Sequence, residues 1–467
     1  MDGRIVVIGS GIGGLSTALA LGRAGHQVLV LDRDALPTSG DAEEAFEADR
    51  RGAPQVHQTH GFLARLVVEM RRHFPDVLAS LYEVGCLTVP ARNNLGEPQP
   101  GDEDLAVLIV RRTTLEWLLR EAALAQPGVE LRPSCGVAGL THHVVDGVPM
   151  IDGVRLEDGS EIAAGLVVDA SGRRSTVPHL LSQLGVDIDE QVHESGLMYL
   201  SRWYRVPSGV EVPLDEKLGG DLGHLKFLAV PGDGRTLSIT LAVRVTDTEL
   251  RACLSDPDGF EQAVRMLEGP SRFFAAGPLE PIGGVRPMAG LLNRTRRFLG
   301  EDGAPVVLGL HAVGDSHTCT NPLYGRGCSL ALVQSLRLTD AIAAHGADAV
   351  ARAQAYEAAC RREIEPWYHS SVEMDVAGSD PGIDGDGAER PPNPMARVFV
   401  AAETDPVIGR ALTRMMNLLV TPAELGDDAE FSARVAAIFA DPDAYPLPPR
   451  PGPSRRELLA ALAAPAL

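Results

Sequence analysis

The sequence predicts an α/β fold, with a mixed β-sheet domain inserted into it and helices after it. Three observations indicate this fold. An apolar run at Ile5–Ile8 leads into a glycine-rich turn and a helical pattern, and a second apolar run follows. Residues 190–300 instead contain several short β-type runs. An apolar strand and a long helical pattern then return at 304–344. Alternation of strand, helix and strand is typical of a parallel sheet covered by helices.

The first element is the stretch IVVIGSGIGGLSTALALGRAGHQVLVLD at 5–32. Gly9 permits a tight turn from strand to helix, Gly11 leaves room for a pyrophosphate, and Gly14 lets the helix pack against the strands. The helix N-terminus favours phosphate groups, and Asp32 ends the second strand where it can accept hydrogen bonds from a ribose. The stretch therefore predicts a Rossmann-like dinucleotide site. The alternative is a glycine turn that binds no ligand.

The remaining elements follow in order along the chain. We expect residues 1–189 to form the first part of the nucleotide domain, 190–300 the inserted substrate domain, and 301–345 the return of the nucleotide domain. Residues 346–467 form a C-terminal helical region with a flexible loop near 376–394, where Gly, Pro and Asp are frequent. Residues 41–49 are acidic and small, and we interpret them as a mobile surface loop. Helical spacing is present at 61–74, 77–81, 113–124, 260–267, 327–344 and 351–370, and strand patterns at 105–110, 129–131, 137–145, 148–156, 166–168, 198–206, 225–230, 237–245 and 304–314.

Composition excludes several classes of partner. The 467 residues carry a formal net charge of −21, which disfavours binding to nucleic acid. No window approaches 18 uninterrupted apolar residues, so we expect no membrane span. The six cysteines form no CxxC pair, which argues against disulfides and a metal cluster and fits a reducing cytoplasm. The two lysines are Lys217 and Lys226. The oligomeric state stays open.

Two later motifs complete the pattern. VVDASGRRSTVP at 167–178 places a small-residue turn after a strand, and HAVGDSHTCTNPLYGRGCSLAL at 311–332 joins a strand, a turn and a helix. Over about residues 1–345 the three motifs together resemble flavin-dependent monooxygenases of the para-hydroxybenzoate hydroxylase type. RRGAPQVHQTHGFL at 50–63 is similar to a pattern of polyether-antibiotic epoxidases and related actinobacterial hydroxylases. The resemblance implies FAD as cofactor and oxygen transfer from a C4a-hydroperoxyflavin.

The resemblance also assigns individual residues. It implies that Asp32 binds the adenosine ribose, Val137 lies near the adenine, Arg112 opens a helix near the flavin, and Asp315 binds the ribityl chain. Independently of it, the fork of one arginine of the Arg50–Arg51 pair suits a pyrophosphate. The expected cofactor-binding residues are Gly9, Gly11, Ile12, Gly13, Gly14, Asp32, Arg33, Arg51, Arg112, Val137, Gly314, Asp315, Pro322, Gly325, Gly327 and Cys328.

The last glycine motif has a physical explanation of its own. Gly325 and Gly327 let the backbone lie against a flat ring. A helix that begins near Gly327 points its N–H groups at the ring edge that becomes negative on reduction, and so stabilises the reduced form. The alternative is a glycine turn that merely starts a buried helix.

One motif departs from the hydroxylase pattern. Hydroxylases of this type carry Ala-Asp-Gly where this chain has Ala170, Ser171 and Gly172, and the acid lies earlier, at Asp169. The Asp-Ala-Ser-Gly form resembles flavin-dependent halogenases, lycopene cyclases and geranylgeranyl reductases. Because the missing aspartate helps with reduced nicotinamide in the hydroxylases, the electron source is either NAD(P)H or a separate flavin reductase.

The sequence therefore predicts an FAD-dependent monooxygenase of secondary metabolism that hydroxylates or epoxidises an apolar small molecule with O2. The alternatives are a halogenase, an FAD-dependent reductase or dehydrogenase of a polyprenyl substrate, and a non-enzymatic binder like the prenyl-GTPase escort proteins. Halogenases usually carry a WxWxIP motif and an early lysine, and this chain has neither. The complete motif at 315–327 argues against the binder.

No protein nucleophile is expected, because the cofactor carries the chemistry. The spacing of His57 and His60 suggests a metal pair, but no carboxylate or cysteine clusters with them, and packing or a place near the flavin fits His60 better. The candidates for a catalytic part are His60, Pro322 and Gly327, and the candidates for the substrate pocket are Trp203, Tyr204 and Tyr324.

Overall fold

The computed structural model describes residues 3–36, 40–90, 95–210, 218–378, 394–449 and 452–463. Most of the loop expected at 376–394 lies outside these residues, as does Lys217. Within the described part of the chain, no helix combines the length and apolarity that crossing a bilayer requires.

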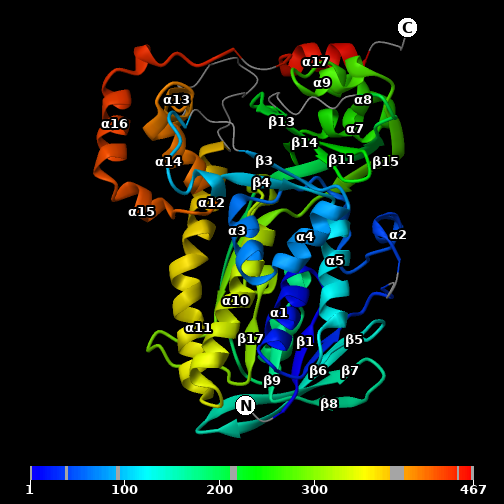
Figure 1. The fold of residues 1–467 in the computed structure, drawn as a ribbon, viewed down its shortest axis with the longest axis vertical. Helices are drawn as coiled ribbons and strands as arrows, with labels where there is room; N and C mark the ends of the chain where they lie inside the picture. Colours follow the sequence, from blue (N-terminus) through cyan, green and yellow to red (C-terminus); the bar gives the residue numbers. More distant parts are fainter. Residues whose placement is uncertain are drawn as a thin grey trace.

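A parallel five-stranded sheet forms the centre of the nucleotide domain (Figure 1). The strand order is β17-β9-β1-β2-β5. Ile5 and Val7 of β1 pack on one face of the sheet, and Val6 and Ile8 pack on the other. Because both faces are buried, the strands are apolar throughout. The bounds are β1 Ile5–Ile8, β2 Val28–Leu31, β5 Val129–Arg132, β9 Leu166–Asp169 and β17 Leu310–Ala312.

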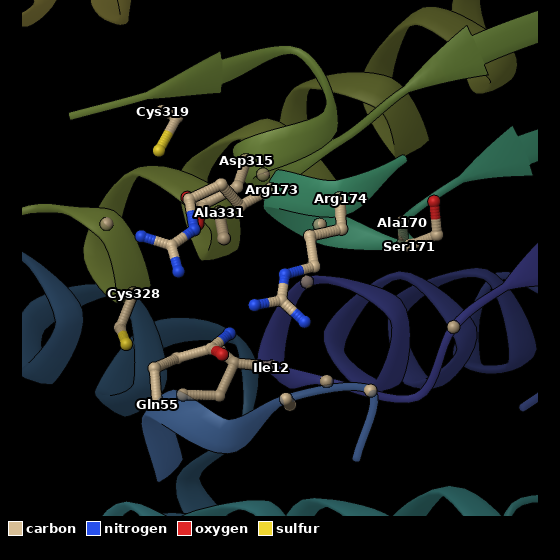
Figure 2. Close-up of a pocket in the computed structure, with 18 of the residues that line it drawn as sticks. Ile12, Gln55, Ala170, Ser171, Arg173, Arg174, Asp315, Cys319, Cys328 and Ala331 are labelled. Carbon is tan, nitrogen blue, oxygen red and sulfur yellow. The ribbon is translucent and has the colours of Figure 1, made fainter. Parts of the chain in front are cut away.

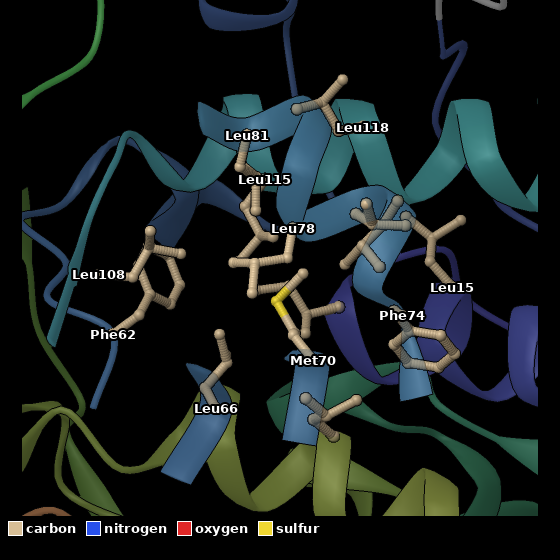
Figure 3. Packing of buried hydrophobic residues seen from close by; sticks show 14 of the residues in the cluster. Leu15, Phe62, Leu66, Met70, Phe74, Leu78, Leu81, Leu108, Leu115 and Leu118 are labelled. Atoms are coloured by element: carbon tan, nitrogen blue, oxygen red, sulfur yellow. The ribbon is translucent and has the colours of Figure 1, made fainter. Parts of the chain in front are cut away.

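Helices cover one face of this sheet and a second sheet covers the other. The covering helices are α1 (Ile12–Arg23), α5 (Arg112–Ala125) and α10 (Gly327–His345), with α3 (Ala64–His73) and α4 (Pro75–Glu83) outside them. Figure 3 shows the apolar core between α1, α3, α4 and α5, where Met70 lies among leucine and phenylalanine side chains. The opposite face packs against the antiparallel sheet of β6 (Val137–Val145), β7 (Val148–Leu156) and β8 (Glu161–Ala163).

Close contact between α1 and α10 sets the position of two glycine turns. The Thr17 hydroxyl donates a hydrogen bond of 2.7 Å to the carbonyl of Gly13. The Ser335 hydroxyl lies 2.9 Å from that of Thr17 and 3.0 Å from the same Gly13 carbonyl. The helices are thus joined near their N-terminal halves, and both turns open into the same space.

The inserted domain is an antiparallel sheet in the order β12-β13-β14-β11-β15. One face packs on α7 (Thr248–Ser255), α8 (Pro257–Arg265) and α9 (Pro270–Ala276), and the other faces the nucleotide domain. A small sheet of β10 (Asp189–Glu194), β16 (Leu292–Arg297) and β18 (Thr318–Cys319) connects the two parts. The strands of the insert are β11 Leu197–Arg205, β12 Gly219–Asp221, β13 Leu225–Gly232, β14 Thr236–Arg244 and β15 Glu280–Met288.

A buried ion pair holds the insert on the nucleotide domain. The Arg111 guanidinium donates to the carboxylate of Asp233, at the tip of the β13–β14 hairpin, over 2.7 and 3.1 Å. The backbone N–H of Arg111 and the Thr114 hydroxyl donate to the same carboxylate, each over 2.7 Å. Asp233 therefore joins the hairpin to the beginning of α5.

The expectation of a mobile loop at 41–49 is wrong. The structure has a helix there, α2 (Ala42–Glu47), whose first N–H groups donate to the side chain of Asp41. Phe46 is buried, with its ring edge-on to Trp203 at 5.2 Å between centroids. The acidic residues indicated a solvated loop, but one cap and one buried aromatic side chain stabilise a short helix.

The C-terminal helices pack in three different parts of the molecule. Helix α11 (Ala349–Glu363) follows α10 and packs beside it, and α12 (Glu365–Gly378) packs against α11 and β16. Helices α13 (Pro394–Ala401), α14 (Pro406–Met416), α15 (Pro422–Gly426) and α16 (Ala429–Ala440) form a core of their own. Helix α17 (Arg455–Leu462) returns to the inserted domain (Figure 1), and its Leu458 is fully buried there.

The short elements complete the fold. β3 and β4 form a two-stranded sheet, and α6 follows the turn after β9. Their bounds are β3 Leu87–Pro90, β4 Ala106–Ile109 and α6 Val177–Ser182.

Candidate active site

One cavity of about 450 Å³ lies between the nucleotide domain and the inserted sheet. All three glycine-containing motifs and the segment at 52–63 contribute to its wall, and Tyr199, Leu228 and Met288 of the inserted sheet close one end. Its volume is within the range of about 300–1,000 Å³ that is usual for small-molecule sites.

The glycines of the first motif have different tasks. A Cβ atom on Gly9 would lie 2.6 Å from the carbonyl oxygen of Ala170, and one on Gly14 would lie 1.9 Å from that of Gly9. These two glycines are required by the packing of the protein itself. A Cβ on Gly11 would meet only an oxygen of Glu116, at 4.0 Å, and would otherwise point into the cavity. The missing side chain of Gly11 therefore leaves space for a ligand.

Asp32 lies in the wall at one end of the cavity and is buried. Its carboxylate accepts hydrogen bonds from the backbone N–H and the hydroxyl of Ser10, the former at 2.8 Å, and from the N–H of Asp34 at 2.8 Å. These bonds fix the carboxylate at the mouth of the glycine turn. Arg33 and Val137 lie in the same wall.

Arg50, and not Arg51, reaches the cavity. The Arg51 side chain is 88% exposed and pairs with Asp49 at 2.9 Å, away from the wall. Arg50 is buried in the wall, with its guanidinium 2.9 Å from Glu116 and 3.2 Å from Asp34. The structure thus supports Arg50 for the contact that we expected from Arg51.

Glu116 also holds a second arginine of the wall. Arg112 donates to it over 2.9 Å, and the far end of the Arg112 guanidinium lies 3.3 Å from Nε2 of His60. Burial, and then the charge of Arg112, lowers the pKa of His60 to about 3. The neutral ring donates from Nδ1 to the carbonyl of Gln58 over 2.9 Å and accepts from Arg112 at Nε2. His60 is therefore a fixed neutral group.

The third motif forms a part of the wall that adjoins the segment at 52–63 through Gly325. Gly314, Asp315, Pro322, Gly325, Gly327 and Cys328 all line the cavity. Burial raises the pKa of Asp315 and raises that of the Cys328 thiol to about 11. α10 begins at Gly327, so the unpaired N–H groups of its first turn lie at the wall. Tyr324 also lines the cavity, and its hydroxyl donates to Asp375 over 2.7 Å.

The Asp-Ala-Ser-Gly turn connects two motifs. Asp169 is buried outside the cavity wall and accepts hydrogen bonds from the Ser171 N–H at 3.0 Å and the Ser316 hydroxyl at 3.2 Å. It thereby joins the turn after β9 to the segment that contains Asp315. Ser171 and Gly172 lie in the wall themselves.

Sequence reasoning missed several residues of the wall. Figure 2 shows Arg173 and Arg174 reaching into the cavity from the turn after β9, with Gln55 and Ile12 on the facing side. Gln58 and Thr59 line the cavity as well. The paired arginines directly after the small-residue turn were a usable signal. Nothing in the local pattern distinguished Gln55, Gln58 or Thr59.

Trp203 and Tyr204 do not line the cavity. They point to opposite faces of β11, as strand alternation predicts. Trp203 is covered by Phe46 and donates to the carbonyl of His57 over 2.7 Å, and Tyr204 lies in the core of the insert beside Phe274. His57 packs against Phe46 and is outside the wall. Within the described residues no cluster of His, Cys, Asp or Glu is arranged to hold a metal ion.

The residues present fit FAD. Gly11 leaves space at a helix N-terminus for a pyrophosphate, Asp32 lies at one end for a ribose, and α10 begins at the other glycine turn. The described wall therefore offers places for the ribose, the pyrophosphate and the ring of the dinucleotide along one cavity.

Comparisons with known proteins agree with this geometry. Residues 4–97 match the family described as FAD dependent oxidoreductase. Protein Rv3254 of Mycobacterium tuberculosis is 27% identical over 468 residues, covering 90% of this chain and 92% of the relative.

Two solved structures show the fold. PqsL, a probable FAD-dependent monooxygenase from Pseudomonas aeruginosa, has a TM-score of 0.61 at 19% identity, covering 80% of this chain and 94% of PqsL. The flavin-dependent brominase Bmp2 has a TM-score of 0.61 at 16% identity, covering 94% and 98%. Residues 4–97 of the chain are thus similar to FAD-dependent oxidoreductases. Its fold is that of the FAD-dependent monooxygenases.

Proposed function

We propose that the protein is an FAD-dependent monooxygenase that hydroxylates or epoxidises an apolar small molecule. One observation carries the proposal. The space beside the glycine turns continues into a compartment under the inserted sheet, where Leu228, Met288 and Leu292 form the wall. A cofactor in the first part would meet an apolar substrate in the second.

In this reaction the residues of the chain bind and orient the cofactor and the substrate. FAD, when bound, supplies the redox chemistry and the activation of O2. Gly11 and the N-terminus of α1 hold its phosphates, and Asp32 its ribose. The N-terminus of α10 stabilises negative charge at the ring edge. The wall of the inserted sheet excludes water from the reacting atoms.

His60 positions the Arg112 guanidinium and does not transfer a proton. Both ring nitrogens have partners, and its pKa of about 3 keeps the ring neutral at physiological pH. It fixes the orientation of the Arg112 guanidinium. Burial lowers the pKa of Arg112, but Glu116, Cys328 and Asp315 together raise it by more, so the guanidinium stays charged. Pro322 and Gly327 contribute wall and backbone to the ring site.

Halogenation receives no support from the wall. Bmp2 shares the fold, so the fold alone leaves the reaction open. Early lysines are usual in flavin-dependent halogenases, but no described residue of the wall is a lysine. Lys226 pairs instead with Asp221 and borders a second cavity of about 210 Å³ behind Leu323 and Tyr324.

The electrons come from NAD(P)H, directly or through a separate flavin reductase. Ser171 occupies the wall position where an aspartate of the hydroxylase pattern would help reduced nicotinamide, which favours the separate reductase. All six cysteines are free thiols in the structure, which fits a protein of the cytoplasm.

The test measures flavin content, reduction and oxygen transfer. The purified protein should contain FAD, and its visible band should bleach with NADPH or NADH, either alone or after addition of a flavin reductase. Under ¹⁸O2, mass spectrometry of turnovers with apolar candidate substrates should show one labelled oxygen atom in the product. A colourless protein that binds no added FAD, or a product reduced or halogenated without labelled oxygen, would contradict the proposal.

A further inference from the structure

A fully buried arginine lies directly behind one part of the cavity wall. Arg326 is the residue between Gly325 and Gly327, which both line the cavity, and it immediately precedes α10. Its Cα atom is therefore about 3.8 Å from those of the two wall glycines. Its side chain is 0% exposed and extends away from the cavity into the core. One short turn thus provides both a part of the wall and a buried charge.

The guanidinium of Arg326 has only uncharged hydrogen-bond partners in the described part of the chain, and all of them belong to α12. It donates to the carbonyl of Trp367 at 3.2 Å and to the hydroxyls of Ser371 and Ser370 at 2.8 and 3.3 Å. It also lies 3.5 Å from the sulfur of Met374. Its Nε–H has no partner. The charge is held in position by α12 but is not neutralised there.

Two aromatic rings complete the surroundings of this charge. The guanidinium lies 5.0 Å from the ring centroid of Tyr324 and 5.2 Å from that of Trp367, which is the distance of a cation–π contact. Burial lowers the pKa of Arg326 to about 10, although Tyr324 and Asp375 oppose this effect. The guanidinium is therefore charged at neutral pH. The carboxylate of Asp375 itself bonds to Tyr324 and Asn321 instead.

Two arginines of the wall differ from Arg326 in this respect. Arg112 donates to the carboxylate of Glu116 over 2.9 Å, and the guanidinium of Arg50 lies 2.9 Å from the same carboxylate. A buried cation without such a partner is unfavourable, and a negative charge that develops nearby relieves this cost. In a dry core, where the dielectric constant is low, the charge also acts over a longer distance than in water.

We propose that Arg326 favours reduction of the bound FAD by stabilising the negative charge that its ring acquires. The inference rests on the proposed function and concerns redox control of the same site. Hydride transfer from NAD(P)H adds two electrons and one proton to the ring and releases NAD(P)⁺, so the ring gains one negative charge. Arg326 acts from behind the glycine turn as a positioning charge, with the same sign as the N-terminus of α10.

The test measures the reduction potential of the FAD-loaded protein against a redox dye of known potential. Arg326→Met and Arg326→Gln remove the charge, and Arg326→Lys keeps it. We expect the equilibrium constant for two-electron reduction to fall about tenfold in both neutral variants, which is about 30 mV. Arg326→Lys should stay within about threefold of the parent. Oxidised FAD, whose ring is uncharged, should bind to all three variants as it does to the parent.

The matched control removes a buried arginine at the other end of the same helix. Arg352 is 2% exposed, lies outside the cavity wall and donates to the carbonyl of Gly346, which follows the last residue of α10. At about 1.5 Å per residue, the 19 residues of α10 separate the two ends by about 28 Å. Arg352→Met should therefore leave the potential of the bound FAD unchanged.

A second measurement distinguishes this effect from a purely structural role. Urea unfolding of the oxidised holoprotein should show Arg326→Met to be about as stable as the parent, because an apolar side chain then replaces a buried charge that has no ionic partner. If Arg326 only fastens the turn to α12, both neutral variants should lose stability at an unchanged potential, and that result would overturn the inference.

The remaining outcomes separate this inference from the proposed function. An equal fall of the potential in Arg352→Met, a fall in Arg326→Lys as large as in Arg326→Met, or loss of oxidised FAD from both neutral variants would overturn the inference alone. The expected shifts without any incorporation of ¹⁸O into a product would contradict monooxygenation and leave the role of Arg326 standing.

Discussion

The hydroxyl of Tyr324 donates to the carboxylate of Asp375 over 2.7 Å, which joins the loop that contains Pro322 to helix α12. The amides of Asn321 and Asn293 donate to the same carboxylate over 2.8 and 2.7 Å. Asp375 is buried and lies outside the wall of the main cavity. One side chain from beyond the nucleotide domain thus holds the loop on both sides of Pro322.

Replacing this carboxylate should loosen the loop. We expect Asp375→Asn to lower the free energy of unfolding by about 1–3 kcal/mol, because a buried donor then faces an amide N–H group instead of an oxygen. FAD should also dissociate faster, as followed by flavin fluorescence. The control is Asp340→Asn, since Asp340 is 66% exposed and pairs only at the surface with Arg337. Equal effects of the two variants would contradict the role of Asp375.

The two turn glycines should differ in what they affect. Gly11→Val should abolish most FAD binding and leave the thermal stability of the apoprotein nearly unchanged, because its side chain enters open space and its φ of −75° suits any residue. Gly14→Ala should destabilise the apoprotein by about 1–3 kcal/mol through overpacking against the Gly9 carbonyl. Melting curves and FAD titrations check both. A Gly11→Val protein saturated with FAD would refute the pyrophosphate assignment.

Breaking the Arg111–Asp233 ion pair between the nucleotide domain and the inserted domain should destabilise the fold strongly. Asp233→Ala leaves the Arg111 guanidinium buried with Glu43 as its one remaining charged partner among the described residues, and we expect a loss of about 3–5 kcal/mol in unfolding free energy. Glu43→Gln is the control, because Glu43 is 41% exposed and should contribute about 1 kcal/mol or less. Urea unfolding measures both, and a small loss in Asp233→Ala would show that the insert is held by other contacts.

Acid should destabilise the fold through buried neutral histidines. Burial, and then the charge of Arg352, lowers the pKa of His311 from 6.5 to about 3. As the pH falls below 6.5, His311 binds a proton in the unfolded chain but stays neutral in the folded chain. The free energy of unfolding therefore decreases. At pH 5 the loss is about 2 kcal/mol for this residue. The variant His311→Gln should lose about 2 kcal/mol less than the parent between pH 7 and pH 5 in urea unfolding. An identical loss would show that His311 is protonated in the folded protein.

The parts of the fold that were predictable are those with local physical causes. The Gly9–Gly14 turn, the strands of the central sheet and the helix at Gly327 each follow from a short stretch of residues. Asp32 and Asp315 could be located because a parallel sheet brings the carboxyl ends of its strands to one edge.

The unpredicted parts depend on residues distant in sequence. Trp203 faces the cavity side of its sheet but is covered by Phe46, which no pattern near Trp203 reveals. The side chains of Arg50 and Arg51 look equivalent in the chain, and only the buried positions of Asp34 and Glu116 select Arg50.

The return of α17 to the inserted domain has a consequence for biosynthesis. Leu458 completes a core whose other members lie between Met198 and Phe273. During translation the insert is therefore made long before its last apolar layer leaves the ribosome. We expect the nascent chain to expose this surface for the time needed to make nearly 200 further residues, and so to require chaperone protection until synthesis has passed α17.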